Sequence, residues 1–406
     1  MRLRTLILSC SALLALLYPL VMWQKKLIFS LFPPLKGIAS WFWIAEPVFL
    51  ALVLLASSTG IRQKIICYLC IILAACCLAF AAAEMHFKPP SVQVASREYD
   101  SENSIHVKSG QTAHLYEKDD ALPDPLLGYG PNTKAQKVAA RRVNGDNVIY
   151  DVLYSRDEEG RRITPDRGDK ADTAILLFGC SFTLGMGVND QETFAWQLGK
   201  ILGEKFQVFN YGFMGYGAQQ MLALIESGRL DACVQRYKKS YAFFLTIADH
   251  PRRCLGPGPF YQGPVYILEN GAAKYAGRPK HILDSFFAHS LAYTHFKRAY
   301  HRRILAERAQ NTHVAIIAKA MHEMDARYHA PFLTLIWPDY IHAEPMLREK
   351  GVRTLPLTGA MPDYASAPGK YVIRGDGHPN ALAHTRIAEA LSAYILQNVQ
   401  ARGKQP

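Results

Sequence analysis

The sequence predicts an α/β fold in three layers, a parallel sheet with helices on both faces, preceded by an N-terminal helical membrane region. Two observations predict it. From residue 173 onward, short continuous apolar runs alternate with segments of helical periodicity, as in chains that build a parallel sheet. The first 85 residues are dominated by Leu, Ile, Ala, Phe and Cys, whereas the rest has the mixed composition of a soluble globular domain. The chain is therefore expected to combine a membrane part with a folded domain.

Apolar runs and helical segments follow one another through the second half of the chain. A strand that is apolar at every position is typical of a parallel sheet covered on both faces. Ile387, Leu391 and Ile395 recur at helical spacing and are expected in the core. The expected strands are 174–178, 206–210, 241–247 and 332–337, and the expected helices are 192–202, 218–226, 313–328 and a last one from about 381.

Three apolar stretches, at about 6–23, 39–57 and 65–83, each have close to the roughly 20 residues that cross a bilayer as a helix. Residues 1–85 are therefore expected to form three transmembrane helices. Basic residues before the first span and in the loop 60–64 favour the cytoplasmic side, although three lysines in the first loop oppose this orientation. The prediction is a multi-pass protein of the cell inner membrane, in contact with membrane lipid, whose C-terminal domain is extracytoplasmic.

Residues 86–172 are interpreted as a linker with a small β-rich embellishment. The stretch from His86 to about Pro125 is polar and weakly periodic. Residues 143–154 alternate apolar and polar side chains around Gly145-Asp146-Asn147, which is typical of a hairpin. The main domain is expected to span 173–406.

The chain carries a formal net charge of +12. Such a balance is typical of a basic surface beside anionic lipid headgroups, or of an acidic partner such as an anionic polysaccharide. Its Arg and Lys residues are scattered and are not interleaved with stacking aromatics, so no nucleic-acid module is indicated. Three cysteines lie outside the apolar segments, and two of them, Cys233 and Cys254, are candidates for a disulfide in an oxidising compartment.

Four short segments carry candidate chemistry, and each lies where a ligand binds in such a sheet, beyond a strand's carboxyl end. Ser181, in Gly179-Cys-Ser-Phe-Thr183, follows the first strand. Gly215 lies in the glycine-rich loop 210–217, where an exposed N–H could donate to an oxyanion. Asp249 and His250 follow the third strand. In 376–380, His378 could serve as a general base for a serine, with Asp376 orienting it.

Taken in this order, the segments resemble the sequence blocks of the SGNH/GDSL hydrolase family. Residues 179–183 are similar to its GDSFT block, with Cys180 in place of the usual Asp, and 376–380 are similar to its last block. The resemblance covers about Thr173 to the end. It implies a flavodoxin-like three-layer sheet and a catalytic triad of Ser181, His378 and Asp376. Together with the three apolar stretches of residues 1–85, it predicts a membrane-anchored member of the family.

The resemblance also implies an oxyanion hole formed by the N–H groups of Ser181 and Gly215. The family's third block normally reads GxND, and its Asn donates to the oxyanion. Here Asp249 lies near that position and is the candidate third member. A carboxylate repels an oxyanion unless it is protonated or turned away, so the hole is expected to rely on the N–H groups of Ser181 and Gly215, with His250 or Arg252 as a candidate helper.

In the family's last block the Asp commonly precedes the His by three residues. In this sequence Gly375 occupies that place, and Asp376 lies two residues before His378. A one-residue change in a loop can still bring the carboxylate to the imidazole.

These residues predict a serine esterase or O-acyltransferase without a cofactor or metal, acting on an ester-bearing cell-envelope glycan or a lipid-linked sugar. Cys180 is the rival nucleophile. A non-catalytic glycan-binding or assembly module with the same fold is the alternative from another class, and Asp249 favours it. A metal site of Asp249, His250, Asp376 and His378 has no supporting ligand spacing.

Overall fold

The computed structural model describes residues 92–93, 112–116, 121–255, 263–278, 299–300 and 304–402. The three predicted membrane spans lie outside these residues, so the spans, their orientation and the localisation stay predictions. Among the described helices, none has both the length and the hydrophobicity to span a membrane.

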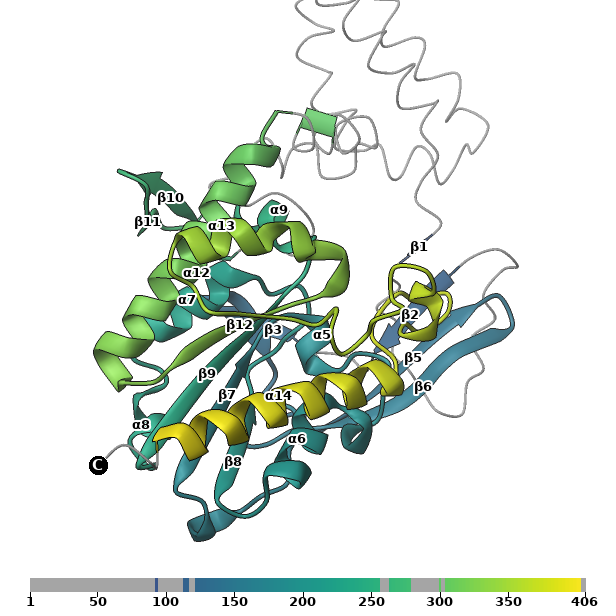
Figure 1. Cartoon of the computed structure of the whole chain (residues 1–406). Helices are drawn as coiled ribbons and strands as arrows, with labels where there is room; N and C mark the ends of the chain where they lie inside the picture. The colour runs from purple at the N-terminus through teal and green to yellow at the C-terminus, as the bar shows by residue number, and fades with distance from the viewer. Residues whose placement is uncertain are drawn as a thin grey trace, which may run out of the picture. The chain divides into compact units, whose positions relative to one another are not determined.

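A five-stranded sheet forms the centre of the described domain (Figure 1). Its strands are β7 (Thr173–Phe178), β8 (Phe206–Asn210), β9 (Lys239–Thr246), β12 (Phe332–Ile336) and β13 (Thr354–Pro356). Their order is β13-β12-β9-β7-β8, and every neighbouring pair is parallel. This is the flavodoxin-like order, in which the connections reverse direction between β7 and β9. The predicted parallel sheet is confirmed.

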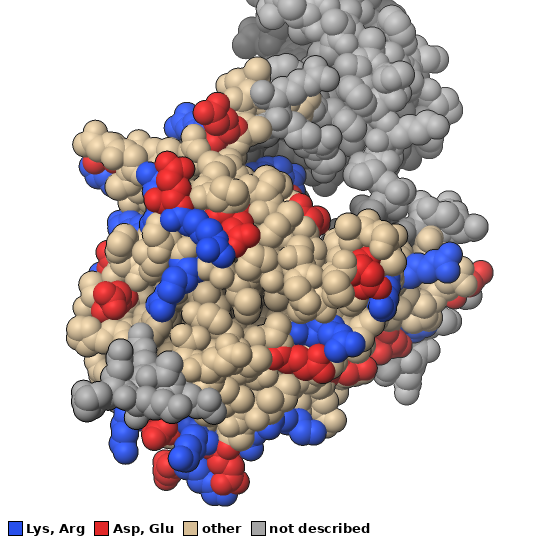
Figure 2. Space-filling view, viewed as in Figure 1, with Lys and Arg blue, Asp and Glu red and all other residues tan. Residues whose placement is uncertain are grey.

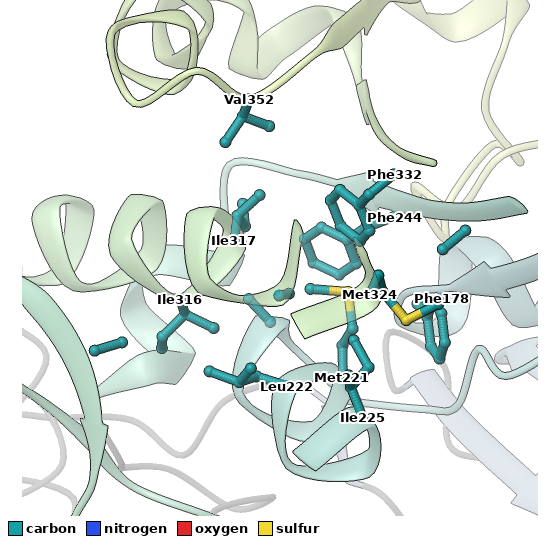
Figure 3. Packing of buried hydrophobic residues seen from close by; sticks show 14 of the residues in the cluster. Phe178, Met221, Leu222, Ile225, Phe244, Ile316, Ile317, Met324, Phe332 and Val352 are labelled. Carbon is teal, nitrogen blue, oxygen red and sulfur yellow. The ribbon is translucent and has the colours of Figure 1, made fainter. Parts of the chain in front are cut away.

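Helices cover both faces of the sheet, which confirms the predicted three layers. Helices α7 (Ala218–Glu226) and α12 (Ala306–Tyr328) pack on one face against Leu176 and Phe178 (Figure 3). Helices α6 (Phe194–Leu202) and α14 (Ala381–Arg402) pack on the other face against Ile175 and Leu177. Residues 174–178 of strand β7 are all apolar because alternate side chains of the strand enter two different cores. The predicted core residues of α14, Ile387, Leu391 and Ile395, are all buried.

Short elements join these layers. The remaining helices of the described part are α5 (Ser181–Leu184), α8 (Asp231–Val234), α9 (His250–Cys254) and α13 (Glu344–Glu349). Single 3₁₀ turns occur at η1 (Gly168–Lys170), η2 (Asp190–Glu192) and η4 (Pro368–Lys370), with a longer one at η3 (Pro338–Ala343). A hairpin of β10 (Tyr266–Glu269) and β11 (Ala272–Tyr275) lies outside the central sheet.

The predicted hairpin of residues 143–154 belongs to a separate, mostly antiparallel sheet. Strands β5 (Lys137–Asn144) and β6 (Asn147–Ser155) pair across the two-residue turn Gly145-Asp146. The sheet continues through β2 (Thr112–Tyr116) to β1 (Val92–Gln93). The stretch expected to be only a linker therefore contributes strands, together with the small pair β3 (Ala121–Asp124) and β4 (Gly128–Pro131).

The face of β5 and β6 that carries Val138, Ala140 and Tyr154 is buried. It packs against Met186, Met214 and Ile373, which lie in three different loops beside the central sheet. The small sheet is thus fixed to the same edge of the domain at which the candidate site residues lie.

The charged side chains on the face shown in Figure 2 are mixed in sign, with Lys and Arg beside Asp and Glu. The cysteines outside the apolar segments are all free, so the candidate pairing of Cys233 with Cys254 is wrong. The Cys254 thiol lies 3.6 Å from the His313 ring in the core, whereas Cys233 is half-buried beside Tyr211.

Candidate active site

Ser181 is the first residue of α5, in the tight turn that follows β7. Gly179 has a φ of 155°, and a Cβ there would lie 2.0 Å from the Thr183 hydroxyl oxygen, so only glycine fits this turn. Cys180 is extended and precedes the helix. The short turn sets the Ser181 hydroxyl at the carboxyl edge of the sheet, where the sequence analysis expected it.

His378 lies in a loop whose backbone is held at both ends. The Ile373 N–H donates to the His378 carbonyl at 2.8 Å, and the Asp376 N–H donates to the Ile373 carbonyl at 3.0 Å. Gly375 and Gly377 have φ values of 82° and 92°, in the region that favours glycine. These contacts curl the loop so that Asp376 and His378 point toward each other.

The structure brings Ser181, His378 and Asp376 together. The His378 Nε2 atom lies 2.9 Å from the Ser181 Oγ atom, and the His378 Nδ1 atom contacts the Asp376 Oδ1 atom. The Asp376 Oδ1 atom also accepts from the His378 backbone N–H at 3.1 Å. A separation of two residues between Asp and His therefore suffices to place the carboxylate on the imidazole.

The Asp376 side chain has no exposure to solvent, and its second oxygen contacts the Arg142 guanidinium. Burial alone would raise the pKa of this carboxyl. The hydrogen bond from His378 and the charges of His378 and Arg142 outweigh burial and lower the pKa to about 2. Asp376 is therefore a carboxylate in the working pH range of an enzyme.

Two side chains beside the triad were not predicted as site residues, although one of them, Phe182, lies within the segment 179–183 that carries Ser181. Phe182 lies with its ring centroid 5.4 Å from that of His378 and 5.1 Å from that of Trp337, which it meets edge-on. Trp337 in turn donates to the Tyr364 hydroxyl at 3.0 Å. Arg142 comes from the hairpin, 234 positions before Asp376. Nothing in the local pattern of the hairpin distinguishes this arginine from its neighbours.

The loop that carries Gly215 lies against the Ser181 turn. The Phe213 N–H donates to the Gly179 carbonyl at 3.3 Å, and the Asn210 side-chain amide donates to the Thr183 carbonyl at 2.9 Å. In the part of the chain that the structure describes, neither the Ser181 N–H nor the Gly215 N–H has a recorded acceptor. Both N–H groups therefore stay candidate oxyanion donors.

Asp249 and His250 are engaged elsewhere. The Asp249 carboxylate binds Arg252 at 2.6 Å and Arg253 at 2.9 Å. His250 is fully buried, and its Nδ1 atom accepts from the Ile247 N–H at 3.4 Å. Burial, together with the charge of Arg253, lowers the pKa of His250 well below its usual range. Among the described residues no recorded contact joins Asp249, His250 or Arg252 to Ser181 or His378.

The Cys180 side chain is fully buried in the core beneath α6 and α14, whereas Ser181 contacts the imidazole. This arrangement favours Ser181 as nucleophile over Cys180. Within residues 121–255, 263–278 and 304–402 the structure holds no group of three or more His, Cys, Asp or Glu side chains suited to a metal ion.

No family model and no curated protein matches the chain. The structure is similar to a member of the lipolytic G-D-S-L family from Veillonella parvula DSM 2008, at 14% identity over 54% of this chain and 95% of that one, with a TM-score of 0.31. It is similar to the native aryl esterase of M. smegmatis at 11% identity, over 55% and 99% of the two chains, with a TM-score of 0.32.

A two-domain esterase active on acetylated mannans is similar at 11% identity, over 58% of this chain and 51% of that one, with a TM-score of 0.33. Similarities this weak carry no functional argument. The geometry of the site carries it instead.

Proposed function

We propose that this chain is a serine esterase or O-acyltransferase of the SGNH type. The observation that carries the proposal is the 2.9 Å contact between the Ser181 hydroxyl and His378 Nε2, with Asp376 on the opposite ring nitrogen. A nucleophile, a base within hydrogen-bond reach and a carboxylate that orients the base are the arrangement required for acyl transfer.

The reaction begins when Ser181 Oγ attacks an ester carbonyl while His378 Nε2 accepts its proton. Asp376 holds the Nδ1–H tautomer and stabilises the imidazolium that forms. The N–H groups of Ser181 and Gly215 donate to the developing oxyanion. His378 then protonates the departing alcohol, which leaves an acyl-Ser181 ester. Water or a second hydroxyl attacks that ester while His378 takes its proton, and His378 returns the proton to Ser181 Oγ as the acyl group leaves.

The substrate we propose is an ester-bearing cell-envelope glycan or a lipid-linked sugar. The support comes from the three apolar stretches of residues 1–85, which would hold the domain at a membrane surface. The choice between water and a sugar hydroxyl as acceptor separates the esterase from the acyltransferase.

The full chain, incubated with a fluorophosphonate probe and with p-nitrophenyl acetate, tests the proposal. We expect the wild type to be labelled and to turn over the ester. Ser181→Ala is expected to lose labelling, and Ser181→Ala and His378→Ala to lose about 10⁴-fold or more in kcat, as when a triad member is removed. Cys180→Ala, the adjacent buried thiol, is the matched control and should keep both activities.

Labelling that persists in Ser181→Ala would contradict the assigned nucleophile. Loss of labelling in Cys180→Ala with an intact fold would favour the rival thiol. A folded wild-type chain without labelling or turnover would favour the glycan-binding or assembly module.

A further inference from the structure

Arg142 connects the small antiparallel sheet to the candidate triad. Its Nη1 atom contacts the Asp376 Oδ2 atom, whereas His378 contacts the Oδ1 atom, so the two groups hold different oxygens of one carboxylate. Arg142 is 10% exposed in its side chain and Asp376 is not exposed at all. The Coulomb attraction between two charges shielded in this way is stronger than between two exposed charges.

Strand β5 directs the Arg142 side chain toward Asp376. Val138, Ala140 and Arg142 share the buried face of β5, which packs against Met186, Met214 and Ile373 in the loops around the site. A register shift, typical of a bulge, falls between Arg142 and Val143. Bulges bend a strand and redirect a side chain, often beside an active site.

The hydrogen-bond acceptors of Arg142 differ from those of Arg162, a structural arginine nearby. Arg162 is fully buried and donates to three carbonyls, those of Leu184, Gly185 and Val188, and to Asp190. Arg142 has one recorded acceptor among the described residues, the Asp376 carboxylate, and its buried Nε atom has none there. Its charge is therefore directed at the triad.

Two charged or titratable groups act most strongly on the Asp376 carboxylate, Arg142 of β5 and His378 of its own loop. His378 in turn faces Ser181 of α5, and it acts at longer range on the buried His384 of α14. Removing the charge of Arg142 should therefore act on the Asp376–His378 pair directly.

We propose that Arg142 is a positioning residue of the triad, which fixes the Asp376 carboxylate on the His378 Nδ1 atom and shares its negative charge. The inference rests on the proposed function. Arg142 touches no reacting atom. It prevents rotation of the carboxylate. Because it shares the negative charge of Asp376, it also makes an imidazolium at His378 less stable than it would be if Arg142 were absent.

Two measurable consequences follow from a neutral residue at this position. The value of kcat should fall more than KM changes, because the base is less well oriented in the transition state. The acid limb of the kcat/KM profile should move to higher pH by roughly one unit, because the imidazolium next to an unshared carboxylate is more stable.

The experiment compares the wild-type full chain with Arg142→Met, Arg142→Gln, Arg142→Lys and Arg141→Met. Each measured rate is divided by the concentration of active serine, titrated with a fluorophosphonate. We expect Arg142→Met and Arg142→Gln to lose about tenfold or more in kcat/KM and to shift the acid limb upward. Arg142→Lys keeps the charge and should retain the wild-type limb with a smaller loss. Arg141, the next residue on the strand, lies 3.7 Å from Asp151 and is 33% exposed, so Arg141→Met is the matched control and should change kcat/KM by less than twofold.

A wild-type acid limb in a folded, labelled Arg142→Gln or Arg142→Met chain would overturn the inference while the proposed function stands. The same conclusion follows if Arg142→Lys shifts the limb as far as Arg142→Gln does. If Arg142→Met does not fold, the comparison of Gln with Lys decides alone. A folded wild type that is neither labelled nor active overturns the proposed function, and the inference with it.

Discussion

The Asp376 carboxylate carries a charge inside the protein because two donors hold it. Its side chain is shielded from solvent, and the His378 ring and the Arg142 guanidinium each contact one oxygen. Charge at this position is costly without partners and stable with them. The same residue thus orients the base in the proposed reaction and contributes to the stability of the fold.

The stability of the chain should depend on the protonation of Asp376. Its pKa of about 2 in the folded state lies below the value of about 3.9 of an unfolded Asp, so its contribution is complete above about pH 4 and is lost as the pH falls toward 2. Between pH 5 and pH 2 we expect the free energy of unfolding of the wild type to fall on the order of 2 kcal/mol further than that of Asp376→Asn.

Urea unfolding of the two chains across this pH range measures that difference. Other carboxyls with lowered pKa values, such as Asp124, are present in both chains, so they cancel in the comparison. Parallel pH dependences in the two chains would contradict the assigned ionisation of Asp376.

At the scale of single elements, the corner between β9 and α9 supports the glycine loop. Asp249 precedes α9 and binds Arg253, whose Nη1 atom donates to the Tyr216 carbonyl at 2.6 Å. Tyr216 directly follows Gly215. The Asp249 carboxylate therefore orders an arginine that holds the loop of the candidate oxyanion donor.

Arg253→Met should disturb the oxyanion hole without removing a donor. We expect kcat to fall roughly tenfold, less than the roughly 10²–10³-fold loss that follows deletion of a donor. Arg252→Met is the matched control, because Arg252 binds the same carboxylate but is 42% exposed in its side chain against 12% for Arg253. Steady-state kinetics on p-nitrophenyl acetate compare the two. Equal effects of both substitutions would assign the role to Asp249 alone and not to the Tyr216 contact.

Elements with a strong local signal were predictable from the sequence. The structure reproduces the expected bounds of β8 and α7, because a buried apolar strand and a helix that opens after a glycine each have a distinct pattern. Helix α12 begins at Ala306 instead of His313, because its first turns are polar and exposed on several positions. Strand β13 has three half-buried residues and no apolar run, so it was missed.

The candidate site divides in the same way. Ser181, Gly215, Asp376 and His378 each lie in a short segment with its own recognisable pattern, and three of them meet as the sequence analysis expected. Arg142 was not predicted, because its contact with Asp376 joins residues 234 positions apart and forms only in the folded chain. The surroundings of Asp249 show how far local sequence reaches. Its partners Arg252 and Arg253 are neighbours in the sequence, whereas the contact of Arg253 with the Tyr216 carbonyl exists only in the folded chain.

At the scale of the whole described domain, the central sheet separates two hydrophobic cores. Leu222 of α7 is buried in one core and Leu391 of α14 in the other, both without exposure. Among the described residues the two cores share no member, because the strands of the sheet send alternate side chains to each side.

Leu222→Ala and Leu391→Ala should therefore each destabilise the chain by about 2–5 kcal/mol, through lost transfer free energy and the cavity left behind. Their effects should add to within about 0.5 kcal/mol in the double variant, because the two side chains share no neighbours across the sheet. Denaturant unfolding of the four chains of this cycle measures the coupling. A coupling energy above about 1 kcal/mol would contradict the separation of the cores, and would mean that a cavity on one face shifts the strands enough to loosen the packing on the other.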